Sequence, residues 1–339
     1  MRATLIFCCL AIGLSIPSTI SVSVGQDVKS PASESEILDL LLKDTPKPKY
    51  GAAVPTEISG RVAVHASGEI SGAEGVSVTD GYSVTTTDAQ GVYRLKPNKH
   101  AVFIYITRPT GHNVQRDWYK PLAAKVDFEL NPADMDEDEY VFVHVTDTHV
   151  SQNRRSLVGL SRFVREVNAL TPQPRFVVNS GDLLNLHKAL VSSPESGQAD
   201  FRKYVGIMNH LDMPHYSVSG DHTDSSYRMK QFPRGDHRCG KPLYWEHLGP
   251  HFFSFEYGRI HFVSVDFGYH LGQRQIPVNG KQLEYPTNEV QPMHAEWMRQ
   301  DMHRRTPGTF VVTASEADLE DHCPDFAGMA RLNDVRLQL

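Results

Sequence analysis

The chain has 339 residues and a formal net charge of −6, with 22% charged and 40% hydrophobic residues. Its mean hydropathy of −0.37 is ordinary for a soluble globular protein and excludes a disordered chain or a multi-span membrane protein. The sequence contains no block of basic residues, so it offers no nucleic-acid-binding patch. The length allows two domains with a sizeable core.

Residues 1–25 have the pattern of a secretory signal peptide. Arg2 precedes an apolar run that ends near Ile16, which is short for a membrane span, and small residues at Ser23 and Gly25 offer a cleavage site. The pattern predicts a protein that is secreted or lies in the periplasm or cell envelope, with no transmembrane segment beyond this peptide. An uncleaved anchor is the alternative.

Only two cysteines, Cys239 and Cys323, lie beyond the predicted signal peptide. A disulfide between them and two unrelated thiols are both compatible with the sequence. Two thiolates are too few for a structural zinc site made of cysteines.

Two β-poor segments flank a β-rich one. Residues 26–55 are rich in proline and small polar residues and are predicted to be a linker. Residues 56–132 contain short alternating runs separated by turn residues, which predicts a small all-β sandwich. The acidic stretch at 133–139 lacks the glycine and the ligand spacing of an EF-hand loop, so a solvated interdomain linker is favoured over a calcium site.

The predicted sandwich contains a TD-x-x-G-x-Y hairpin formed by Thr87, Asp88, Gly91 and Tyr93. The hairpin resembles that of the small transthyretin-type or carboxypeptidase-regulatory-type domains. The resemblance implies a module that supports or positions a neighbouring domain, and no nucleophile-and-base arrangement stands out within it.

From residue 140 to residue 339, apolar strands alternate with stretches of helical periodicity, which predicts a layered α/β domain. The predicted strands are VFVHVTD, RFVVNSGD, PHYSVSGD, the hairpin HFFSFEYGRIHFVSVDF and TFVVTAS. The predicted helices are SLVGLSRFVREVNAL, FRKYVGIMNHL and PMHAEWMRQDMHRRT.

Polar side chains follow three of these strands at the point where each strand ends. Asp147 and His149 follow the first strand, Asp182 follows the second, and Asp221 and His222 follow the third. Ligands of layered α/β domains gather beyond the carboxyl ends of the strands, and residues two apart in an extended segment point to the same side. Carboxylate together with imidazole suits zinc, manganese or iron.

The order of these motifs, D-x-H, then G-D, then G-D-H, resembles the calcineurin-like metallophosphoesterase family. The resemblance extends to the hairpin at 252–268 and to the helix that contains AEWMRQDM, and it covers about half the chain. It implies a layered metallophosphoesterase domain at 140–339 that hydrolyses a phosphoester with one or two divalent metal ions (Mn, Fe or Zn). The class of the phosphoester substrate is open.

Carried over position by position, the resemblance implies that Asp147 and His149 bind the first metal and that Asp182 bridges both metals. Asp221 stands where the family has an asparagine that binds the second metal. His222 is implied to act as the general acid near the leaving group.

Two family motifs are not found. Ser315 takes the place of a lone histidine ligand of the second metal, and no G-H-x-H follows before residue 339, so the domain is predicted to be incomplete at its carboxyl end. Glu316, Asp318 and His322 are nearby donors, but strand phase points Glu316 away from Ser315. Of the family's ligands for the second metal, the sequence therefore keeps Asp182 and the substituted Asp221.

Two functional hypotheses follow. The first is a secreted metal-dependent phosphoesterase. The second is a non-catalytic binding or cell-envelope protein, or a truncated gene product, that retains only part of the two-metal site. His144 on the first strand is predicted to be a packed strand histidine rather than a ligand.

Overall fold

The computed structural model describes residues 4–7, 53–114, 118–133, 137, 139–151, 153–186, 194–224, 238–278, 281–323 and 325–339, with the backbone alone for 4–7 and 268–289. The predicted linker at 26–55, apart from residues 53–55, and the predicted signal peptide, apart from residues 4–7, lie outside these residues. Among the described residues, no helix has both the length and the apolar character needed to cross a membrane.

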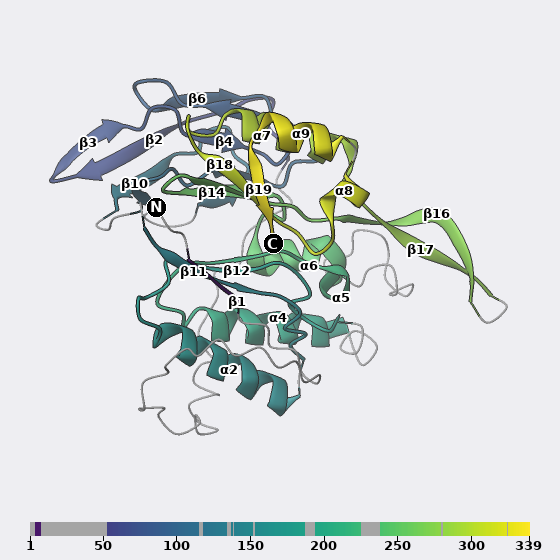
Figure 1. Ribbon diagram of the computed structural model, residues 1–339. Coiled ribbons are helices and arrows are strands. Elements are labelled where there is room, and N and C mark those ends of the chain that lie inside the picture. The colour runs from purple at the N-terminus through teal and green to yellow at the C-terminus, as the bar shows by residue number, and fades with distance from the viewer. Residues whose placement is uncertain are drawn as a thin grey trace.

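The amino-terminal region folds as two packed β-sheets (Figure 1). One sheet has the order β3-β2-β10-β8, with β6 also paired to β2, and the other has the order β5-β4-β7-β9. Ile58, Val62, Ile104 and Phe128 are almost fully buried between the sheets. The strands are β2 (Ile58–Ala66), β3 (Glu69–Gly72), β4 (Ser77–Thr79), β5 (Val84–Thr86), β6 (Val92–Leu95), β7 (Phe103–Ile106), β8 (His112–Val114), β9 (Tyr119–Pro121) and β10 (Phe128–Pro132).

The second region is a layered α/β domain built on two further sheets. One has the order β1-β11-β12-β13, and the other has the order β14-β15-β18-β19. Its elements are β1 (Thr4–Phe7), β11 (Val141–Val145), α2 (Arg154–Asn168), β12 (Val177–Asn179), α4 (Pro194–Met208), β13 (His215–Ser217), α5 (Asp221–Asp224), α6 (Gly240–Leu248), β14 (Phe253–Tyr257), β15 (Ile260–Ser264), β16 (Gly268–Val278), β17 (Lys281–Glu289), α7 (Pro292–His303), β18 (Phe310–Ala314), α8 (Leu319–His322), α9 (Phe326–Leu332) and β19 (Val335–Gln338).

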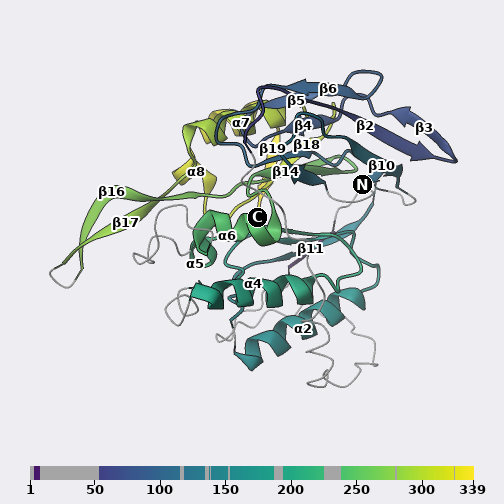
Figure 2. The same cartoon turned by 180° about the vertical axis from the view of Figure 1, so that it is seen from behind.

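The two sheets of this domain face each other across an aromatic core. Phe142 and Phe176 from one sheet contact Phe255 and Phe262 from the other. Helices α2 and α4 cover the outer face of the first sheet and α6 packs against the same core, while α7, α8 and α9 pack against the core of the second sheet (Figures 1 and 2). The predicted α/β layered domain preceded by an all-β sandwich is therefore confirmed.

Local sequence explains why the elements form where they do. All five residues of β11 are buried, as expected for a parallel strand covered on both faces. Helix α2 begins after Asn153, whose side chain accepts a hydrogen bond from the Arg155 N–H, and its buried side chains recur at helical spacing. Helix α7 begins with Pro292, which suits the first helical turn.

Strand β1 pairs in parallel with β11, from Thr4 opposite Val141 to Phe7 opposite His144. This strand lies inside the predicted signal peptide, so a chain cleaved before Gln26 would lack it. Strand β11 would then form the edge of the sheet. Cleavage of the peptide stays a prediction.

The sandwich and the α/β domain share buried polar contacts. The Tyr105 hydroxyl donates to the carbonyl of Phe252 (2.6 Å), and the Trp297 indole N–H donates to Thr79 Oγ1 (2.9 Å). The Thr107 and Ser254 hydroxyls lie 2.7 Å apart. These bonds fix the sandwich against β14 and α7, because a buried polar group that lost its partner would be left unsatisfied.

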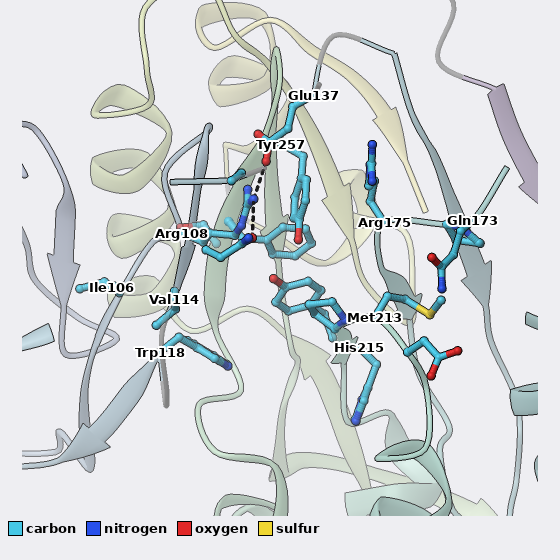
Figure 3. Close-up of a pocket in the computed structure, with 18 residues that line it drawn as sticks. Ile106, Arg108, Val114, Trp118, Glu137, Gln173, Arg175, Met213, His215 and Tyr257 are labelled. Carbon is cyan, nitrogen blue, oxygen red and sulfur yellow. Dashed lines mark hydrogen bonds and ion pairs between the residues drawn. The ribbon is translucent and has the colours of Figure 1, made fainter. Parts of the chain in front are cut away.

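The acidic stretch before the α/β domain is not wholly solvated, so the prediction of a solvated linker is wrong at Glu137. Its side chain is buried and forms an ion pair with Arg108, whose guanidinium lies 3.6 Å from the centre of the Tyr257 ring (Figure 3). A cavity of about 410 Å³ opens beside this pair, between the sandwich and the amino ends of β12 and β13. Burying a carboxylate here is tolerable because an arginine neutralises it.

Cys239 and Cys323 are both buried and unbridged. Burial raises the pKa of the Cys323 thiol to about 11. Of the two alternatives that the sequence allowed, the structure therefore shows unrelated thiols.

Candidate metal centre

The candidate site lies where β11, β12 and β13 end. These strands are parallel and adjacent, so their carboxyl ends meet at one edge of the sheet. The chain turns sharply there, and Asp147, His149 and Asp182 all have positive φ angles, between 42° and 55°. The Asp147 N–H donates to the Gly181 carbonyl (3.1 Å) and the His149 N–H to that of Asp182 (2.9 Å), so hydrogen bonds hold this strained backbone.

Gly220 allows two of the strand ends to approach each other closely. It has a φ of 79°, and a Cβ atom built there would lie 2.2 Å from the backbone nitrogen of Asp182. Any side chain at this position would push the loops apart. The Gly before Asp221 is therefore needed both for its conformation and for space.

A first group of donors combines imidazole and carboxylate. His149, Asp182 and His222 each place one ligand atom within 4.8 Å of the others. His149 Nε2 is 3.4 Å from Asp182 Oδ2, and the His149 and His222 rings meet edge to face, 4.6 Å apart. The backbone N–H of His222 donates to Asp182 Oδ1 (2.9 Å), which orients the carboxylate at the site.

A second group shares Asp182 and is made of carboxylates alone. Asp182, Asp221 and Glu316 each place one oxygen within 4.8 Å of the others. The Asp221 N–H donates to Glu316 Oε1 (2.8 Å). Asp182 is buried, whereas Asp221 and Glu316 are partly exposed, as are the two histidines of the first group.

Asp147 is only loosely associated with these groups. Its side chain is 64% exposed, and its Oδ1 lies 3.5 Å from His149 Nε2. Thr146 Oγ1 donates to its other oxygen (2.8 Å). The structure brings Asp147 to the rim of the site but into neither group of donors.

Burial raises the pKa of Asp182 above its ordinary value, and the neighbouring Asp221 carboxylate raises it further. The backbone N–H of His222 and the imidazoles of His149 and His222 lower the pKa of Asp182. Concentrated negative charge of this kind is costly unless a cation neutralises it. Among the described residues, no hydrogen-bond partner reaches Nδ1 of His149, although this atom is buried. The donor set therefore fits one or two divalent cations.

Some predicted neighbours take other roles. Ser315, at the expected histidine position, donates its hydroxyl hydrogen bond to the Ala317 carbonyl (2.9 Å). Asp318 caps helix α8 through the Glu320 N–H (2.8 Å). The His322 ring packs edge to face with Phe267, so neither it nor Asp318 joins a donor group among the described residues.

Glu316 corrects the expectation drawn from strand phase. Strand β18 ends at Ala314, so the alternation of side chains no longer governs residue 316. Its carboxylate turns towards Asp182 and Asp221. The sequence does offer one signal for Glu316: it is an acidic residue just beyond the carboxyl end of a predicted strand, as Asp182 and Asp221 are.

Two residues beside His222 are structural. Thr223 is buried and accepts a hydrogen bond from the Leu184 N–H (3.1 Å). Asp224 is also buried and pairs with Lys241 Nζ at 3.4 Å. Lys241 also pairs with Asp266, and burial raises the pKa of Asp266 to about 6.

His144 behaves as the sequence predicts. It is buried on β11, and its Nε2 lies 2.8 Å from Ser180 Oγ. Burial lowers the pKa of His144, so the ring is neutral near pH 7. It supports the loop that carries Asp182 rather than binding a metal.

Comparison with known proteins now identifies the family. A family model described as calcineurin-like phosphoesterase matches residues 140–338, and one described as the N-terminal domain of calcineurin-like phosphoesterase matches residues 56–133. A search of curated proteins found no significant match. The transthyretin-type resemblance of the sandwich stays a prediction. The domain supports metal-dependent phosphoester hydrolysis in general terms. The larger match spans more than half of the sequence, and the chain belongs to the calcineurin-like phosphoesterase family.

Proposed function

We propose that this protein is a phosphoesterase that acts outside the cytoplasm and uses divalent metal ions held by Asp147, His149, Asp182 and Asp221. The observation that carries the proposal is the convergence of donors from three strand ends on the shared carboxylate of Asp182. Family membership supports the general reaction, and the donor chemistry supports the metals.

Each residue has a distinct task in this proposal. Asp147 and His149 would hold one ion, Asp221 would hold the other, and Asp182 would be a ligand shared by both. Cations bound there would polarise the phosphoryl oxygen and lower the pKa of a water molecule. The strained, hydrogen-bonded loops keep the donors in place, so little reorganisation accompanies binding of the substrate.

His222 is assigned the general-acid role. Its ring lies beside that of His149, its Nε2 is 3.8 Å from Asp221 Oδ1, and about a third of the side chain is exposed. The partly exposed ring can therefore meet a leaving group at the edge of the site. In this role, His222 donates a proton from its ring to the departing ester oxygen.

The test combines metal analysis with activity. The purified protein is analysed for bound metal and assayed with manganese on a chromogenic phosphodiester and a chromogenic phosphomonoester. We expect bound metal and turnover above a protein-free control. No bound metal and no turnover on either substrate would instead support a non-catalytic binding protein.

The role of His222 is tested separately with His222→Asn. A general acid predicts that the variant keeps its metal content but loses turnover, and that the loss is smaller for esters with better leaving groups. A loss of bound metal would show that His222 is a ligand instead. His303→Asn, on an exposed position of α7, is the matched control.

The extracellular location has its own test. The chain is expressed with its native amino terminus, and the mature protein is recovered from the periplasm or medium and its mass measured. We expect a mass that corresponds to a start at Gln26. A full-length chain that stays with the membrane would support the uncleaved anchor.

A further inference from the structure

We propose that Glu316 is a metal ligand and that, with Asp182 and Asp221, it forms an all-oxygen subsite that selects a hard cation such as magnesium or manganese over zinc. This inference rests on the proposed function, because it assigns a ligand and a metal preference to the same centre. It gives the second subsite a donor at a position where the family pattern has none.

The position of Glu316 follows from the end of β18. This strand pairs in parallel with β15 and ends at Ala314, so the next residues leave the sheet at its carboxyl edge. Glu316 then lies opposite the strand ends that carry Asp182 and Asp221. The second sheet thereby contributes a donor to a site otherwise built from the first sheet.

A hydrogen bond fixes the carboxylate at the site. The Asp221 N–H donates to Glu316 Oε1 at 2.8 Å, and ligand oxygens of Glu316, Asp182 and Asp221 lie within 4.8 Å of one another. Charge-assisted bonds of this kind orient a carboxylate as well as stabilising it. Glu316 is therefore held in place before any cation binds.

The approach of Glu316 depends on Gly181. A Cβ atom built on Gly181 would lie 3.0 Å from Glu316 Cβ and 3.1 Å from Glu316 Cγ. The glutamate stem therefore packs directly against the backbone that leads into Asp182. The G-D motif after β12 serves both carboxylates, because the glycine that admits the turn also makes room for Glu316.

The donor chemistry separates this subsite from its neighbour. The neighbouring subsite includes the imidazole of His149, whereas the group of Asp182, Asp221 and Glu316 contains no imidazole. Oxygen ligands suit magnesium, calcium and manganese, and imidazole suits zinc and iron. Two adjacent subsites with unequal preferences follow from a single shared carboxylate.

Glu316→Gln tests the assignment by direct metal binding. Metal-free protein is titrated with manganese alone and with zinc alone, followed by calorimetry and by the electron paramagnetic resonance of free manganese. We expect wild type to bind two manganese ions per chain and Glu316→Gln to bind one of them at least about 10-fold more weakly. Glu320→Gln, an exposed acidic residue on α8, is the control and should leave both affinities unchanged.

Glu316→His provides a second variant with a defined change of donor. We expect it to shift the affected subsite towards zinc, by at least about 10-fold in the ratio of zinc to manganese affinity. Unchanged binding of both ions in Glu316→Gln, an unchanged zinc-to-manganese ratio in Glu316→His, or a single manganese ion in wild type would each overturn the inference. Circular dichroism establishes that the variants are folded.

The two proposals fail separately. If wild type and the variants bind manganese and zinc as expected but hydrolyse no ester, the phosphoesterase proposal is refuted and the ligand assignment stands. Hydrolysis by wild type together with unchanged metal binding in Glu316→Gln would refute the ligand assignment alone.

Discussion

Two clusters of charged residues in this protein differ in how their negative charge is neutralised. In the interior, His261 lies between Asp301 (2.8 Å from Nε2) and Glu256 (3.1 Å from Nδ1), and all three side chains are almost completely buried. At the metal edge, the buried carboxylate of Asp182 lies close to the partly exposed carboxylates of Asp221 and Glu316. The first cluster carries its own counter-charge, whereas the second depends on added cations.

The comparison separates charge used for stability from charge used for binding. Burial alone would lower the pKa of His261, but Asp301 and Glu256 outweigh it and raise the pKa to about 9. At the metal edge, burial and Asp221 both raise the pKa of Asp182, so ionisation there opposes folding until a cation binds. The backbone of the metal edge is also strained, while β14 and β15 around the interior cluster form a regular ladder.

The largest effect is expected at the shared ligand. Asp182→Asn removes the carboxylate common to both donor groups, so we expect loss of bound metal and a fall in kcat/KM of at least about 100-fold. Metal content and phosphodiester turnover measure this. Asp321→Asn, an exposed acidic residue, serves as the control. Retention of full activity would refute the role of Asp182.

The next effect is on stability. His261→Gln leaves Asp301 and Glu256 buried without their counter-charge, so we expect the free energy of unfolding to fall by about 3–5 kcal/mol. Urea denaturation measures the loss. Metal affinity, measured under native conditions, should be unchanged, because the cluster lies away from the strand ends that hold the donors. A loss of metal affinity without a loss of stability would refute the claim that the His261 cluster stabilises the fold and has no part in metal binding.

The same cluster predicts how stability depends on pH. Because the folded pKa of His261 is raised to about 9 from an ordinary value of 6.5, its contribution is fully present below about pH 6.5 and disappears as the pH rises through about 9. The shift corresponds to on the order of 3 kcal/mol. Unfolding measured from pH 6 to pH 10 without added metal should show this decline in wild type. The decline should be absent in His261→Gln, and parallel profiles for the two proteins would contradict the assignment.

The smallest effect concerns the link between the sandwich and the α/β domain. Ser254 Oγ donates to Asp301 Oδ1 (2.8 Å) and lies 2.7 Å from Thr107 Oγ1. Ser254→Ala should lower the free energy of unfolding by about 1–2 kcal/mol. A double-mutant cycle with Thr107→Val measures the coupling across the interface, and exactly additive effects would show that the hydroxyl pair contributes nothing there.

The sequence predicts the metal edge better than the interior cluster. Asp147, His149, Asp182, Asp221 and His222 stand at strand ends, where local pattern and strand order together determine their position. In the sequence, the position of His261 fits an ordinary histidine at a strand edge as well as a member of a buried charged cluster. Glu256 lies opposite it in the β14–β15 hairpin, but Asp301 reaches it from α7, and contacts between such distant segments leave no periodic signal.

Two other outcomes show the same limit. Glu137 belongs to an acidic run that a solvated linker explains, but Arg108 of the sandwich buries it. Asp224 has the appearance of a turn residue, but Lys241 pairs with it from α6. In each case a basic side chain from elsewhere in the chain offsets the cost of burying a carboxylate. The residues next to the carboxylate in the sequence do not indicate which basic side chain will reach it.

The end of β18 at Ala314 has a consequence for how metal sites change over time. Within a strand, moving a ligand by one residue reverses its direction, so only every second position is interchangeable. Beyond the last ladder residue that restriction disappears, and a donor at the next position can turn into the same space. Strand termini therefore tolerate relocation of a ligand by a single residue. A sequence comparison that looks for each ligand only at its usual alignment position would therefore count such a site as incomplete, although the ligand is present at the next residue.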